Sequence, residues 1–227
     1  MKYGQISVNP TINLTIYRCF DHISEEDAEK FLKKFKDQPH DQVQIMHTFR
    51  ELIAGAYLAA AGLNVKYDYP IRTKTPDWSI FNQDSLQAAV EVTNFHTDNI
   101  TQDSINKAMQ ARGKWADWLA PNNERLYQSI WDKASIYKTL VESEKIAYVI
   151  AVFGEFEAAV EWKELNDCLF GEGYGLFQQY AAVSGVLFFT EGLGGYVFTY
   201  LPNPNSLRSI HLRSDIFLSD IARPSDK

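Results

Sequence analysis

The sequence predicts one α/β domain, and three observations support that prediction. The chain has 227 residues, of which 45% are hydrophobic, which is enough to bury one sizeable core. Two long stretches, 41–61 and 123–141, carry apolar residues at helical spacing. The run 146–153 is apolar almost throughout, which is typical of a strand buried on both faces at a central parallel position in a sheet.

The first forty residues predict an arm and a helix. Asn9-Pro10 is typical of a turn, so we expect a short hairpin or an extended arm over 2–20. A helix then begins with Ser24 as its N-cap and Asp27 three residues later, in a near capping box. Its basic face consists of Lys30, Lys33, Lys34 and Lys36. Such a face is usually solvated, and the alternative is contact with phosphates.

The middle of the chain alternates helices and strands. The helix over 41–61 is expected to end at Gly62 as its C′ residue, and a strand over 63–67 follows. Helices are expected over 101–119 and 123–141, because apolar residues recur there at helical spacing.

The last third predicts a helix followed by a hairpin. The stretch 158–169 has helical character, and the glycines of 171–175 indicate a turn. Two β-rich runs, 183–190 and 196–201, surround further glycines, so we expect a hairpin there. Residues 206–227 are polar and are expected to be partly loose.

The stretch 75–95 predicts two antiparallel strands around a polar turn at 82–85. If this hairpin centres on Asp84, Asp77 faces Glu91 across the strand pair. Like charges directly opposite each other are destabilising, so one carboxyl group should take up a proton or a cation should lie between them. Mg²⁺ keeps both groups ionised, since it binds one or two carboxylates together with waters and phosphates.

The acidic residues of the hairpin form a short motif. Thr93 follows Glu91 by two positions and shares its face of the strand. The motif is Pro76-Asp77 followed by Glu91-Val92-Thr93. It resembles that of the PD-(D/E)xK nuclease superfamily, which has an Asp at the start of the second core strand and Glu-x-Lys on the third. Thr93 stands where that family has its lysine.

This resemblance implies a restriction-endonuclease-like αβββαβ core, with a mixed central sheet flanked by helices and an extra C-terminal β-hairpin. The whole chain, 1–227, is then a single domain. Its core covers about 41–155, its N-terminal arm and helix cover 1–40, and its C-terminal extension covers 156–227.

The resemblance also implies metal-dependent phosphodiester hydrolysis, with DNA as the expected nucleic-acid substrate. Asp77 and Glu91 would hold Mg²⁺ or Mn²⁺, and the backbone carbonyl of Val92 would add a ligand. Glu51, on the helix before the first core strand, is positioned to add a further metal ligand; the alternative is an exposed helix glutamate. Thr93 can hydrogen-bond a catalytic water but supplies no charge.

Members of this family that lack the strand lysine sometimes recruit a lysine or glutamine from the next helix. Lys133 is our first choice for that catalytic role and Gln128 the second, the alternative for Lys133 being a surface lysine. His96, at the end of the third core strand, is a further candidate base or an ordinary loop residue. Arg72 and Lys74 precede the motif and are expected to contact a phosphate backbone.

Composition limits the class of protein. The formal net charge of −7 counts against non-specific coating of nucleic acid, but allows local binding through a basic patch. Cys19 and Cys168, the only cysteines, fit free thiols in a cytoplasmic protein. The longest apolar run, 52–63, is too short to span a bilayer, and the N-terminus lacks the apolar segment of a signal peptide, so we expect no membrane association.

Two other functions stay open. The missing strand lysine allows a catalytically inactive nuclease-fold protein that acts as a binding or assembly subunit. The second alternative is an unrelated α/β protein in which the carboxylates of the hairpin have no role in function. The oligomeric state stays open. The resemblance allows a homodimer, since dimers are common among such enzymes because two strands of a duplex need two sites.

Overall fold

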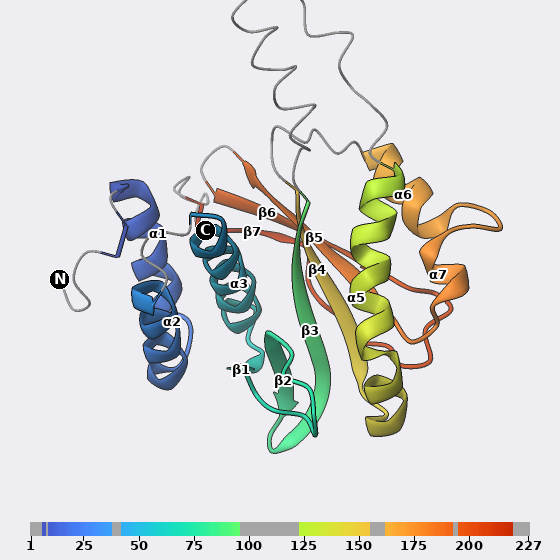
Figure 1. The fold of residues 1–227 in the computed structure, drawn as a ribbon, viewed down its shortest axis with the longest axis horizontal. Coiled ribbons are helices and arrows are strands. Elements are labelled where there is room, and N and C mark those ends of the chain that lie inside the picture. The colour runs from blue at the N-terminus through green and yellow to red at the C-terminus, as the bar shows by residue number, and fades with distance from the viewer. Residues whose placement is uncertain are drawn as a thin grey trace, which may run out of the picture.

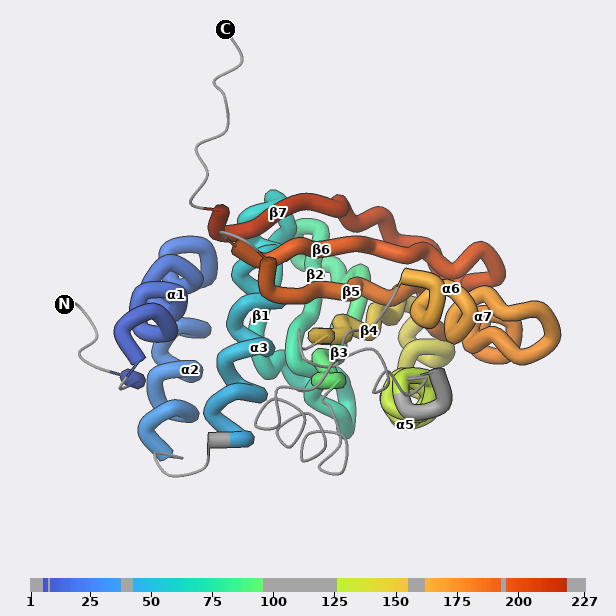
Figure 2. The backbone as a smooth tube through the Cα atoms, turned by 90° about the horizontal axis from the view of Figure 1, so that it is seen from above, coloured from blue at the N-terminus to red at the C-terminus, as the bar shows by residue number. Residues whose placement is uncertain are grey.

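The chain forms one seven-stranded sheet with helices on both faces, as Figures 1 and 2 show. The strands follow the order β1-β2-β3-β4-β5-β6-β7, and the sheet mixes antiparallel and parallel pairs. The computed structural model describes residues 6–7, 9–37, 42–95, 123–154, 162–192 and 195–219. The α/β class expected from the sequence is therefore confirmed.

Three helices cover one face of the sheet: α1 (Pro10–Phe20), α2 (Glu25–Asp37) and α3 (Gln42–Ala60). Of these three helices, α3 lies nearest to the strands in Figure 1, and α1 and α2 lie on its far side from the sheet. Ser24 caps α2 as expected, because its Oγ accepts from the N–H of Asp27 at 3.1 Å.

Helix α1 corrects the arm expected over 2–20. The Asn9 side chain accepts hydrogen bonds from the N–H groups of Thr11 and Ile12, and Pro10 occupies the first helical turn, where its missing N–H costs nothing. The pair Asn9-Pro10 therefore begins a helix instead of forming a turn.

The centre of the fold contains β1 (Asn64–Tyr67), β2 (Trp78–Asn82), β3 (Ser85–Phe95), α5 (Asn123–Glu144) and β4 (Ala147–Gly154). Strands β1, β2 and β3 are antiparallel neighbours, whereas β4 runs parallel to β3. Helix α5 covers the face of the sheet opposite to α3 (Figure 1). These bounds lie close to the expected ones.

The register between β2 and β3 agrees with the expected one near the motif. Trp78 is opposite Val90, and the pairing continues in step to Ile80, after which a bulge shifts it toward the turn. One step back from Trp78, this register brings Asp77 level with Glu91.

The C-terminal part comprises α6 (Trp162–Phe170), α7 (Leu176–Gln179), β5 (Gly185–Gly192), β6 (Gly195–Pro202) and β7 (Asp215–Phe217). The expected hairpin is confirmed as β5 and β6, but it is part of the main sheet, because β5 runs parallel to β4.

The tail expected to be partly loose from residue 206 has no regular secondary structure over 206–214, but it forms a strand before residue 219. Strand β7 pairs with β6, and the side chains of Leu212 and Phe217 are buried. Apolar burial therefore fixes a segment whose composition is largely polar.

The sheet separates two apolar cores, and β3 contributes to both. Val90 and Val92 face the core beneath α3, whereas Ala89 and Phe95 face the core beneath α5. Because side chains alternate along a strand, Glu91 shares the α5 face with Ala89.

Three expectations remain. No helix in the described part of the chain is long and apolar enough to cross a membrane. Cys19 and Cys168 are buried free thiols. The helix expected over 101–119 and His96 lie outside the described residues.

Candidate active site

The site lies beside the first residue of β2, where the pairing between β2 and β3 ends and β3 continues without β2 toward Phe95. From Glu91 to Phe95, β3 pairs with β4, while the ladder to β2 starts at Trp78 and Val90. The carboxylate of Asp77 occupies the open edge, since its Oδ2 accepts from the N–H of Val92 at 2.7 Å. The N–H and C=O of a strand residue project to the same edge, so the Val92 carbonyl is directed to this edge as well.

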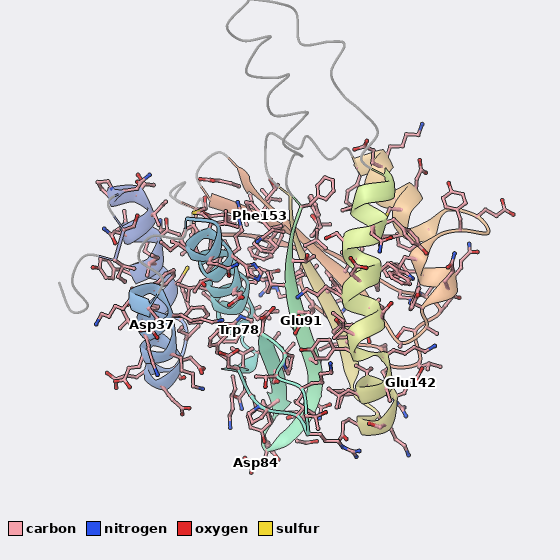
Figure 3. All side chains as sticks on the ribbon, viewed as in Figure 1. Asp37, Trp78, Asp84, Glu91, Glu142 and Phe153 are labelled. Atoms are coloured by element: carbon pink, nitrogen blue, oxygen red, sulfur yellow. The ribbon has the colours of Figure 1, made fainter. Side chains whose placement is uncertain are left out.

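Trp78, the residue after Asp77, anchors helix α3 to this edge. Its buried indole Nε1 donates to the carbonyl of Glu51 at 2.8 Å. The ring lies over Gly55, where a Cβ would come within 1.9 Å of it. Figure 3 shows Trp78 beside α3 and Glu91 on β3, between α3 and α5. This contact brings Glu51 close to the start of β2.

The carboxylate of Glu51 is buried and fully engaged. Its Oε2 accepts from the Tyr67 hydroxyl at 2.5 Å and from Lys34 Nζ at 3.0 Å. Its Oε1 lies 3.3 Å from His47 Nε2. The alternative of an exposed helix glutamate is therefore wrong, and contacts with three side chains fix the position of this carboxylate.

His47 contacts both Glu51 and Asn94. Its Nε2 lies 3.3 Å from Glu51 Oε1, and its Nδ1 lies 2.8 Å from Asn94 Nδ2. Burial lowers the pKa of His47 more than the charge of Glu51 raises it.

Lys133 lies beside Glu91, as the sequence suggested for a helix-borne lysine. Its Nζ donates to Glu91 Oε2 at 2.7 Å, and its side chain is only 26% exposed, so it is not a free surface lysine. One turn earlier on α5, Ser129 Oγ lies 3.1 Å from Thr93 Oγ1. Two strand residues and four helix residues both span roughly 6–7 Å, so a step of four residues on α5 matches a step of two residues on β3.

Gln128, the second choice, faces away from the carboxylates. It is exposed, and its Nε2 donates to Asp132 Oδ1 at 2.6 Å on the same helix. Thr93, for its part, is engaged by Ser129. The charged group nearest Glu91 is therefore Lys133.

The electrostatics of the site centre on Asp77. Burial and the negative charges of Glu51 and Glu91 raise the pKa of Asp77 well above its usual range. The hydrogen bond from the Val92 N–H and the positive charge of Lys133 lower this pKa, but by less. Burial lowers the pKa of Lys133, but the charge and hydrogen bond of Glu91 raise it overall. Lys133 is thus a cation at neutral pH, next to an excess of carboxylates.

The donor set at this edge suits a small divalent cation. In the parts of the chain that the structure describes, no three His, Cys, Asp or Glu side chains form a ready-made metal shell. Mg²⁺ needs only one or two carboxylates, with waters and substrate phosphates completing its octahedron. Asp77, Glu91 and the Val92 carbonyl would supply such ligands. Burial first, and then the charges of Glu51 and Glu91, raise the pKa of Asp77, and a cation would offset those charges.

Arg72 and Lys74 belong to a tight turn that is closed by hydrogen bonds between Ile71 and Lys74, with Arg72 inside the turn and Lys74 at its end. Both are exposed, and Arg72 Nε forms an ion pair with Glu144 Oε1.

Sequence reasoning missed three partners of Glu51: Lys34, His47 and Tyr67. The spacing of His47 and Glu51, four residues apart on a helix, is the signal that was available for one of them. Tyr67 follows Val65 by two residues and so shares its inward face, whereas Lys34 is brought in by tertiary packing.

Comparisons of the chain with protein-family models, curated proteins and solved structures found no match. The functional assignment therefore rests on the geometry of the site.

Proposed function

We propose that the protein is a metal-dependent phosphodiesterase of the PD-(D/E)xK kind, with DNA as its substrate. The observation that carries this proposal is the contact of Lys133 Nζ with Glu91 Oε2 at 2.7 Å, next to Asp77. It supplies a lysine at the acidic motif although Thr93 replaces the strand lysine. The element order α3-β1-β2-β3-α5-β4, with β4 parallel to β3, supports the αβββαβ core.

The roles follow from charge and position. Asp77, Glu91 and the Val92 carbonyl would hold Mg²⁺ or Mn²⁺, which lowers the pKa of a bound water and offsets charge on the phosphate when bound. Lys133 keeps its proton, because Glu91 raises its pKa. It therefore acts as a fixed cation that orients the attacking water and stabilises the transition state, not as the base.

Glu51 has a supporting role in this proposal. Its oxygens already accept from Tyr67 and Lys34 and lie against His47, so it acts chiefly by its charge on Asp77. Arg72 and Lys74 are assigned to the phosphate backbone because they are exposed cations just ahead of β2. A homodimer would place two such sites on the two strands of a duplex.

One observation favours a second function, an inactive binding or assembly subunit. Glu91 and Glu51 are each neutralised by a lysine, so the cluster is stable without a metal. Thr93, held by Ser129, adds no charge at the motif position.

Calorimetric titration of wild type, Asp77→Ala and Glu91→Ala with Mg²⁺ and Mn²⁺ tests the metal site. We expect both substitutions to remove binding. Unchanged metal affinity in both variants would contradict the nuclease proposal. DNA cleavage then separates the two functions, because an inactive subunit binds DNA without cutting it.

A further inference from the structure

The inner face of helix α2 makes several contacts with a single residue of β1, Tyr67. Asp27 Oδ1 accepts from the N–H of Tyr67 at 3.2 Å, and Lys30 Nζ donates to the carbonyl of Tyr67 at 3.1 Å. Lys34, one turn further, donates to the Tyr67 hydroxyl. Residues three and four apart share a helix face, so these contacts fix the register of α2.

Packing reinforces this register. The ring of Phe31 lies 4.0 Å from that of Tyr67, centroid to centroid, and both side chains are buried. The ammonium group of Lys34 is therefore held at a fixed position beside Glu51 and Tyr67, and it is not part of a solvated basic face. Its side chain is 36% exposed, so solvent or a ligand can reach the ammonium group from one side.

Two lysines from different helices thus neutralise two carboxylates of the site. Lys34 Nζ lies 3.0 Å from Glu51 Oε2, and Lys133 Nζ lies 2.7 Å from Glu91 Oε2. An ammonium group this close to a carboxylate repels any divalent cation that enters the cluster, because desolvated charges are weakly screened.

Lys34 is not needed to hold Glu51 in place. The Tyr67 hydroxyl donates to Oε2 and His47 Nε2 lies 3.3 Å from Oε1, so two other side chains contact this carboxylate when Lys34 turns away. The distinctive contribution of Lys34 is its positive charge on a long, partly exposed side chain, which suits pairing with either a carboxylate or a phosphate.

We propose that Lys34 gates metal loading: it neutralises Glu51 in the absence of substrate and turns to a backbone phosphate when DNA enters. This inference rests on the proposed function and assigns its regulation. Its consequence is that the site binds divalent cations weakly alone and more tightly once DNA has drawn Lys34 away from Glu51.

The test is calorimetric titration with Mn²⁺ of wild type, Lys34→Met and Lys34→Gln, each with and without a phosphorothioate DNA duplex that resists cleavage. Without DNA, both variants should bind Mn²⁺ at least about tenfold more tightly than wild type, because a nearby positive charge is gone. The duplex should strengthen Mn²⁺ binding by wild type more than by either variant. Lys33→Met, an exposed lysine on the same helix, should behave as wild type.

Equal or weaker Mn²⁺ binding by both Lys34 variants would overturn the gate. Adding Glu91→Gln to Lys34→Met separates this failure from failure of the proposed function. If Glu91→Gln leaves the Mn²⁺ affinity unchanged, the proposed metal site is wrong. If it abolishes binding while Lys34→Met matches wild type, only the gate is wrong.

Discussion

Lys133 on α5 and Glu91 on β3 form an ion pair across the interface of helix and sheet, with Nζ 2.7 Å from Oε2. The contact arises because α5 runs alongside β3 with matched spacing, as the second contact between Ser129 and Thr93 shows. Thr93 on β3 provides no positive charge at the motif, and Lys133 on α5 provides one instead.

The first prediction concerns this lysine. Lys133→Met should lower the rate of metal-dependent DNA cleavage by about 100-fold or more, because a preorganised cation at the reacting phosphate is lost. Single-turnover cleavage at saturating Mg²⁺ measures the effect.

Lys138→Met is the matched control, since Lys138 is an exposed lysine on the same helix. Gln128→Ala should also retain activity, because Gln128 faces Asp132. Equal losses in Lys133→Met and Lys138→Met would remove the special role of Lys133.

The second prediction links Asp77 to stability. Folding raises the pKa of Asp77, so its ionisation opposes folding at any pH above the unfolded-state pKa. Asp77→Asn should therefore stabilise the fold at neutral pH, by about 1.4 kcal/mol for each unit by which folding raises the pKa. The gain should shrink as the pH falls to the unfolded-state pKa, while cleavage activity is lost.

Urea unfolding of wild type and Asp77→Asn across the range from acidic to mildly alkaline pH measures this effect. Asp84→Asn, in the exposed turn between β2 and β3, should show little change. A pH-independent difference, or a less stable Asp77→Asn at neutral pH, would show that Asp77 is not strained by its carboxylate neighbours.

The third prediction concerns the support of Glu51. Tyr67→Phe removes the hydroxyl that donates to Glu51 Oε2 in a buried setting, which should cost about 1–3 kcal/mol of unfolding free energy. Tyr69→Phe, at a partly exposed tyrosine two residues later, should cost much less. Equal effects in chemical denaturation would mean that the Tyr67 hydroxyl contributes nothing specific.

The fourth prediction concerns the contact between α3 and β2. Gly55→Ala places a Cβ 1.9 Å from the Trp78 ring and should destabilise the fold by about 3 kcal/mol or more. Gly62→Ala, which meets no atom within 4 Å but has a φ of +89°, should cost only about 1–2 kcal/mol. Thermal unfolding of the two variants ranks them, and the reverse order would contradict the close packing of Trp78 on α3.

Local patterns predicted the centre of the fold well. The turn residues at 82–85 predicted the β2–β3 register near the motif, which brings Asp77 level with Glu91. The periodicity of 123–141 placed Lys133 on a helix, and the resemblance of the strand motif to that of the nuclease superfamily nominated it.

Features that depend on tertiary packing were harder to predict. Asn9-Pro10 suits both a turn and a helix start, and the apolar residues of α1 decide between them by burial. Lys34 belongs to a basic helix face that sequence alone assigns to solvent, and only the docking of α2 on Tyr67 turns it inward. Strand β7 is too short to give a periodic signal.

The most direct test of the central claim is cleavage of supercoiled, single-stranded and branched DNA by wild type and Glu91→Gln, side by side, with Mg²⁺ or Mn²⁺. We predict that wild type cleaves at least one substrate only when the metal is present, and that Glu91→Gln cleaves none. Absence of cleavage by wild type on every substrate, with DNA binding retained, would contradict the nuclease assignment and favour the inactive subunit.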